Sequence, residues 1–278
     1  MANETTSSTL DDLFANIILQ ARHVATENAI MLGLVTRHDI AGVAGKTIQI
    51  PKYPAISAAD LTEGTDMSAT EVATTSVTAT VAEVGAQVVM TDMAAYGSGN
   101  VAQELGTVLG NAIATKIDTD LIALFDGFST SLGGAGTEVT AADFFKAAAI
   151  LRNAKAVGTP VAVVHPYHAY QLSANLTNTF ANPNGGDLQN EAMRQGFVGS
   201  IAGIDVYQSA NITVDGNGDA KGLCFVPEAM VIAMKNEFNL ETERNASLRA
   251  FELNATAVYG VAELDDTYGV EMFFDATV

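Results

Sequence analysis

The sequence has little cysteine and few positive charges. Cys224 is the single cysteine among 278 residues, so an internal disulfide is excluded and nothing indicates an oxidising compartment. Lysine and arginine together number 13 against 32 acidic residues, which gives a formal net charge of −19. Tight binding of nucleic acid relies on basic side chains that displace counterions from phosphates, so any contact with DNA is expected to be weak and non-specific.

Long apolar runs are missing too. The N-terminal residues MANETTSSTLDD contain neither the basic nor the apolar segment of a secretory signal. No stretch approaches the roughly 20 apolar residues that a membrane helix needs. We therefore expect a protein of the cytoplasm that makes no contact with a membrane.

Motifs of catalysis are also missing. There is no G-x-S-x-G elbow, and Cys224 lies in the apolar stretch LCFV, where a thiolate is disfavoured. GVAGKT (42–47) ends like a phosphate-binding loop, but Ile40 stands where the first glycine is required. No pair of carboxylates stands out as acid and base. We expect neither enzymatic activity nor a cofactor.

Three other patterns match ligand sites only in part. GSGNVA (97–102) fits a dinucleotide-binding loop that opens a helix, which leaves a nucleotide-dependent oxidoreductase as an alternative. DGNGDA (215–220) resembles a calcium loop, but Val226 replaces the bidentate glutamate. His165 and His168 have no third ligand nearby in the sequence. We expect structural roles for the last two patterns, and no metal.

The sequence is rich in uncharged residues. Hydrophobic residues make up 48% of the chain and charged residues only 16%. Much of the polar surface must therefore come from Thr, Ser, Asn and Gln. Surfaces of such low charge density are typical of chains that partners cover on assembly.

The first 90 residues are expected to form an arm and a long hairpin. Thr9 and Asp12 resemble a capping box ahead of an amphipathic helix that extends to about Met31. Period-two patterns in TIQIPKYPAI (47–56) and TTSVTATVAEVGAQVVMT (74–91) predict two long strands. Between them, SAADLTEGTDMSATE has four acidic residues and no basic one. This tip is either a solvated acidic hairpin or an arm that lies on a neighbouring subunit.

Helical spacing over 98–126 predicts a long spine helix. Its apolar stripe contains Leu105, Val108, Leu109, Ala112, Ile113, Ile117, Leu121 and Leu124. After the break GFSTSLGGAGTEVT, helices and strands alternate up to VGSIAGIDVYQSANI (198–212), which predicts an α/β unit. Alternating residues over 251–261 and 268–274 predict two final strands.

In this order the pieces resemble the major capsid proteins of tailed bacteriophages, the Hong Kong 97-type family, whose fold encapsulins share. The resemblance is carried by VGSIAGIDVYQSANI, PVAVVHPYHAYQL (160–172) and FVPEAMVIAM (225–234). It implies an α+β fold in five parts. These are an N-terminal arm (1–45), an extended β-hairpin called the E-loop (46–90), a peripheral domain with the spine helix (91–137), an α/β axial domain (138–236) and return strands of the peripheral domain (237–278).

The resemblance also implies a structural function. The chain is expected to self-assemble into hexamers and pentamers of an icosahedral shell around the dsDNA of a phage, in the virion, after assembly in the cytoplasm of a bacterial host. Contacts between subunits are expected from the arm and the E-loop, at Leu13, Phe14, Ile17, Ile18, Tyr53, Ile56, Leu61 and Met67. A separate scaffold protein, a portal and a decoration protein are further implied partners, and an encapsulin-like compartment is an alternative.

Some members of this family join their subunits by an isopeptide bond between a loop lysine and a neighbouring asparagine. In this chain Lys46 and Lys52 lie at the root of the loop, and the next lysine is Lys116. Because the tip has no amine, the sequence predicts a non-covalent shell.

Overall fold

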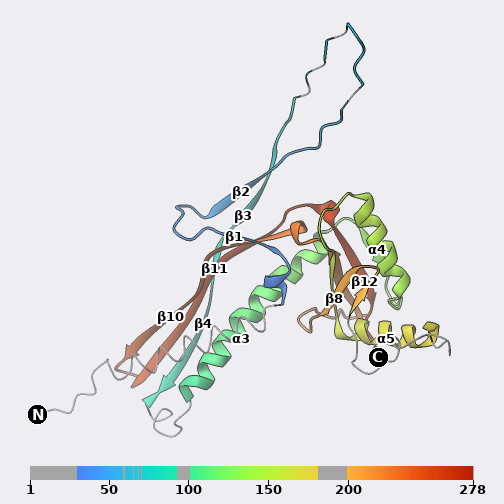
Figure 1. Ribbon diagram of the computed structural model, residues 1–278. Helices are drawn as coiled ribbons and strands as arrows, with labels where there is room; N and C mark the ends of the chain where they lie inside the picture. Colours follow the sequence, from blue (N-terminus) through green and yellow to red (C-terminus); the bar gives the residue numbers. More distant parts are fainter. Residues whose placement is uncertain are drawn as a thin grey trace, which may run out of the picture.

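The computed structural model describes residues 30–58, 60–64, 66–67, 69, 71–92, 101–180 and 199–277, without the side chains of 101–104 and 175–180. These residues form an elongated sheet with a long helix against it, an α/β unit beside them, and a hairpin that projects away from both (Figure 1). None of the helices in this part of the chain is long and apolar enough to cross a bilayer.

The elongated sheet has the strand order β1-β10-β11-β4. Its strands are β1 (Thr36–Asp39), β10 (Met230–Asn245), β11 (Ala250–Glu263) and β4 (Ala82–Thr91). β10, β11 and β4 are antiparallel neighbours, whereas β1 runs parallel to β10. Alternate residues of β11, among them Leu253, Ala255 and Ala257, are buried, because successive side chains of a strand point to opposite faces.

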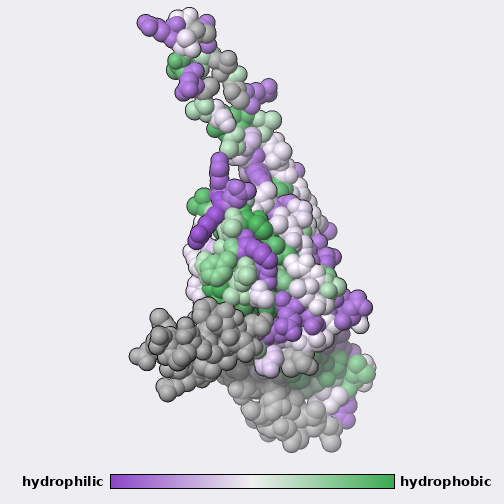
Figure 2. Space-filling model, turned by 90° about the vertical axis from the view of Figure 1, so that its right-hand side faces the viewer, coloured by the Kyte–Doolittle hydropathy of each residue, from purple (hydrophilic) through white to green (hydrophobic). Residues whose placement is uncertain are grey.

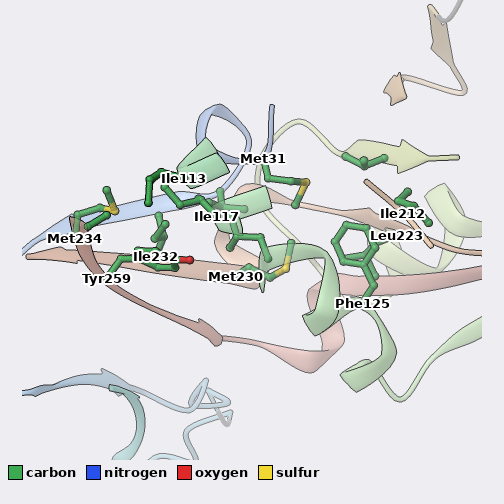
Figure 3. Packing of buried hydrophobic residues seen from close by; sticks show 14 of the residues in the cluster. Met31, Ile113, Ile117, Phe125, Ile212, Leu223, Met230, Ile232, Met234 and Tyr259 are labelled. Atoms are coloured by element: carbon green, nitrogen blue, oxygen red, sulfur yellow. The ribbon is translucent and has the colours of Figure 1, made fainter. Parts of the chain in front are cut away.

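Helix α3 (Val101–Ile122) covers the buried face of this sheet. It buries every fourth residue, at Leu109, Ile113, Ile117 and Leu121, a spacing that places all four on one side of the helix. Figure 3 shows the resulting core, where the helix meets methionine and isoleucine side chains of β10. The predicted stripe is confirmed at these four positions, but Val108, which is 55% exposed, and Ala112, which is also exposed, lie outside it.

The second sheet has the strand order β5-β12-β9-β6-β8-β7. Its strands are β5 (Ser131–Gly133), β12 (Gly269–Asp275), β9 (Asp219–Phe225), β6 (Val161–Val164), β8 (Ile204–Gln208) and β7 (Ser200–Ile201). Helices α4 (Ala141–Asn153) and α5 (Pro166–Phe180) enclose a second core with it, which contains Phe144, Leu172 and Met272. Leu223 and Phe225 belong instead to the first core, so the sheet is buried on both faces. The uninterrupted apolar sequence of β6 follows from this.

The structure corrects the expected extent of two elements. Helix α3 ends at Ile122, and the chain continues as the 3-10 helix η2 (Ala123–Gly127). The predicted strand 74–91 is two strands, β3 (Thr75–Thr80) and β4, in different sheets. A Cβ atom at Gly260 would lie 2.3 Å from the backbone oxygen of Thr80, so only glycine lets the chain cross here from one sheet to the other.

Sheet membership also departs from two expected domain boundaries. β5 and β12 pair with each other inside the six-stranded sheet, although the sequence assigned both to the peripheral domain. Val270, Met272 and Phe274 of β12 fill the core beneath α4 and α5, which requires the last strand to lie there. β10 begins at Met230, before the expected boundary at 236.

Asp118 links three segments at the centre of the molecule. It is fully buried on α3, and its carboxylate accepts hydrogen bonds from the backbone N–H of Met31 (3.1 Å) and the side-chain amide of Asn211 (3.0 Å). Met31 begins the 3-10 helix η1 (Met31–Gly33), and Asn211 lies between β8 and β9. Burial raises the pKa of Asp118 in spite of both hydrogen bonds.

An Asp118→Asn variant should show how this carboxylate affects stability. Because the pKa is raised in the folded state, Asp118 stabilises the fold less as the pH rises through and above its ordinary value of 3.8. Asparagine removes this titration. We expect the free energy of unfolding of the variant, relative to the natural chain, to increase as the pH rises through and above 3.8, and to level off once Asp118 is ionised in the folded state too. Urea unfolding at a series of pH values measures it, and a difference that is constant with pH would contradict the prediction.

Candidate assembly interface

Strands β2 (Thr47–Lys52) and β3 form an antiparallel hairpin that projects from the body (Figure 1). Their pairing runs from Thr47 opposite Thr80 to Lys52 opposite Thr75. Beyond the last pair lies a segment that we call the tip segment (residues 53–74), whose described residues form no helix or strand and are all exposed. Its 22 residues, doubled back, reach at most about 36 Å beyond the last pair.

The root of the hairpin is held against the body. Lys52 Nζ lies 2.5 Å from the carboxylate of Asp265, and Lys235 Nζ donates a hydrogen bond to the carbonyl of Gly45 at 2.8 Å. A small apolar cluster next to them buries Ala79 of β3 against Ala233 of β10. These contacts fix the base of the hairpin.

The tip segment carries the four contact residues that the sequence predicted for the E-loop. Tyr53, Ile56, Leu61 and Met67 expose 69%, 60%, 66% and 73% of their surface. Figure 2 shows hydrophobic and hydrophilic residues interspersed along this projection. Such side chains lose their contact with water only against another molecule, since the segment builds no core of its own. The four predicted arm residues, Leu13, Phe14, Ile17 and Ile18, lie outside the described residues.

The patterns that resembled ligand sites take structural roles. Asp215 Oδ1 accepts backbone hydrogen bonds from Asn217 (2.8 Å) and Asp219 (2.9 Å), which close a turn and lower the pKa of Asp215. His168 is buried, and its Nε2 lies 3.1 Å from the backbone oxygen of Phe274. Across the described residues, no three His, Cys, Asp or Glu side chains are grouped so that they could hold a metal ion. Residues 97–100 of the GSGNVA loop lie outside the described part.

A buried thiol and a surface cleft are the two further features with chemically relevant groups. Burial raises the pKa of the Cys224 thiol to about 12, so it stays protonated and unreactive at neutral pH. A half-open cleft of about 400 Å³ lies between α3, η2 and the turn before β9. Its lysine, Lys221, is paired with Asp126 and Glu271. Neither feature offers an activated nucleophile.

Comparisons with known proteins identify the family and the fold. A family model described as phage capsid protein matches residues 73–271. The structure of Mycobacterium phage Che8 has a TM-score of 0.70 at 21% identity, with 88% of this chain and 90% of that chain covered. The capsid structure of the cyanophage P-SCSP1u has a TM-score of 0.71 at 18% identity, covering 90% and 89%.

A virus-like particle from Pyrococcus furiosus is also similar, with a TM-score of 0.64, 9% identity and coverage of 93% and 98%. No curated protein sequence matches the chain. The structural likenesses confirm the predicted α+β capsid fold. Since the family model spans most of the chain, the chain belongs to the phage capsid protein family, as a structural major capsid protein.

Proposed function

We propose that this chain self-assembles into hexamers and pentamers of a closed icosahedral shell, which encloses the dsDNA genome of a tailed bacteriophage in the virion. The observation that carries the proposal is the tip segment, which is anchored at its root and exposes large apolar side chains far from any core. A closed shell supplies the missing cover, because each subunit places its projections on a neighbour.

The parts of the fold take the following assignments in this proposal. The hairpin β2–β3 with its tip segment is the E-loop. Helix α3 and the four-stranded sheet form the peripheral domain, and the six-stranded sheet with α4 and α5 forms the axial domain. The net charge of −19 fits a container for DNA, since an acidic wall does not bind the packaged phosphates through counterion release.

Electron microscopy of the purified protein tests this function directly. Closed shells of uniform diameter support it, whereas a protein that stays monomeric both alone at high concentration and when co-expressed with its scaffold protein contradicts it. Assembly takes place in the host cytoplasm in this proposal, with a separate scaffold protein, a portal and a decoration protein as partners. If the protein forms shells only with its scaffold protein, the same experiment is done on the co-expressed pair.

A second candidate is an encapsulin-like compartment, which the likeness to the Pyrococcus furiosus virus-like particle favours. The two candidates differ in content, because a phage head holds DNA and a compartment holds protein cargo. Nuclease-protected DNA in native particles supports the phage shell, and particles that contain a co-purifying enzyme and no DNA support the compartment.

Hydrogen exchange should report the covering of the tip segment. We expect its backbone amides to exchange rapidly in the free subunit, because its described residues form no helix or strand. In assembled shells exchange should slow by at least about tenfold, as expected for amides that become hydrogen-bonded or buried. Peptides from β10 serve as the internal control, with slow exchange in both states. Equal rates for the tip segment in the two states would contradict its role between subunits.

A further inference from the structure

One part of this acidic chain is basic. Residues 139–180 contain Lys146, Arg152 and Lys155 but a single acidic residue, Asp143, which gives this stretch a net charge of +2. The whole chain carries −19. The three cations fall on helix α4 and the turn that follows it.

The fold turns these cations outward. Helix α4 starts at a capping box, in which the backbone N–H and the hydroxyl of Thr140 both bind Asp143 Oδ2, at 3.1 and 2.7 Å. The side of the helix that contains Phe144 and Leu151 is buried in the second core. The opposite side and the following turn remain exposed. We call this surface the α4 face; it consists of Phe145, Lys146, Ala149, Arg152, Lys155 and Val157.

The α4 face has apolar as well as basic character. Phe145 is 61% exposed and Val157 is 72% exposed. In Figure 1 the helix lies on the right of the molecule, the side that Figure 2 presents to the viewer. Arg152 in the last helical turn interacts favourably with the helix dipole, but that role accounts for neither exposed apolar side chain. The surface therefore has the composition of an interface.

The charges of Arg152 and Lys155 are uncompensated in the described part of the chain, where neither side chain has an ion-pair partner. Most other cations there are paired, as Lys116 is with Asp120 and Lys52 with Asp265. An adjacent pair of free cations beside exposed apolar side chains suits a partner that is both acidic and apolar.

We infer that the α4 face receives the tip segment of a neighbouring copy of this chain, an inference that rests on the proposed shell function. The tip segment is the complementary surface: it carries Asp60, Glu63, Asp66 and Glu71, no basic residue, and the exposed side chains of Leu61 and Met67. In Figure 1 the hairpin points away from the body on which α4 lies, so the contact is made between copies. Such a head-to-tail contact repeats around a ring.

A second basic surface, at the turn between β10 and β11, is less suited to the tip segment. Arg249 lies there beside Leu248, which is 60% exposed. Its charge is already used within the subunit, because the hydrogen bond from Arg244 and the charge of Arg249 both act to lower the pKa of Asp92. The two basic surfaces can therefore be distinguished by mutation.

Charge reversal with second-site rescue tests the inference. We expect Arg152→Glu/Lys155→Glu to reduce the yield of sedimentable particles at least about tenfold, because like charges then face each other across the contact. Asp60→Arg/Glu63→Arg should cause a similar loss. The chain that combines all four substitutions should recover to within about threefold of the natural yield, since the attraction is restored with its sign reversed.

The matched control is Lys46→Glu/Arg249→Glu, which reverses two other exposed cations and should leave the yield within about twofold. Circular dichroism of each free subunit checks its fold, and Arg152→Gln/Lys155→Gln replaces the reversal if that variant is unfolded, with a smaller expected loss. Normal assembly of the Arg152/Lys155 variants, absence of rescue, or equal rescue of the Asp60→Arg/Glu63→Arg variant by the Lys46→Glu/Arg249→Glu substitutions would each overturn the inference. Absence of particles from the natural chain, both alone and co-expressed with its scaffold protein, would instead count against the proposed function.

Discussion

A chain that lacks residues 57–70 should fold normally and fail to assemble. The deletion removes Leu61 and Met67 but leaves the root contacts of Lys52 and Ala79 intact. Shortening the connection from 22 to 8 residues lowers the entropic cost of closing the loop by about 0.9 kcal/mol, so the free subunit should be slightly stabilised. Full burial of two large apolar side chains contributes at least about 3 kcal/mol, and its loss weakens each contact more than about a hundredfold.

The measurement is the fraction of protein in sedimentable particles, together with the thermal midpoint of the free subunit. A control chain in which residues 57–70 are replaced by Gly and Ser in equal number keeps the reach of the loop but not its side chains. It should fail as the deletion does. Assembly by the control alone would show that the length of the loop matters and its side chains do not. Assembly by both would remove the tip segment from the interface.

The sequence predicted those elements that are determined by local periodicity. The spine helix follows from apolar residues at every fourth position, as at Leu109 and Ile113, and the buried strand β6 follows from its uninterrupted VAVV. The exposed tip segment follows from a composition that cannot form a core. Tyr53 and Met67 are exposed in the structure as expected, and their contact with another subunit remains a prediction.

The partition of strands between sheets was not predictable in the same way. Period-two patterning runs through residues 74–91 without a break, because β3 and β4 each have one partly buried face. The division at Val81 depends on Gly260, which lies 179 residues further along the chain and lets the backbone pass close by. Likewise the alternation within β12 specifies a strand but not its neighbours β5 and β9. Long-range pairing carries no local signal.

The apolar spacing of helix α4 does not reveal the α4 face. Phe144 and Leu151 indicate only the side of the helix that packs into the second core. A local count of charges over 139–180 gives +2 and would have set this segment apart from the rest of the chain. The exposure of Phe145 needed the structure, because Phe144 and Phe145 are adjacent in the sequence and only the orientation of the helix decides which is buried.

Mature particles boiled in SDS with reductant should run as a single band near 28.9 kDa, the mass of one chain. An isopeptide bond between subunits requires a lysine amine that reaches a neighbouring asparagine. The tip segment has no lysine, and Lys52 at the root is paired at 2.5 Å with Asp265 of its own subunit. Lys46 lies at the other end of β2, further from the tip. The shell is therefore expected to be held together by non-covalent contacts.

Particles treated with glutaraldehyde provide the positive control, because they should give a ladder on the same gel and so show that covalent multimers would be detected. The reductant breaks any disulfide bond formed by Cys224. Burial already disfavours such a bond, because it raises the pKa of the Cys224 thiol to about 12. A ladder from untreated particles, with a Lys–Asn linked peptide identified by mass spectrometry, would show that an amine at the root of the hairpin reaches a neighbour after all. If Lys52 is that amine, its ion pair with Asp265 would have to open during maturation. The variant Lys52→Arg keeps the positive charge but removes the nucleophilic amine, so it would then abolish the ladder.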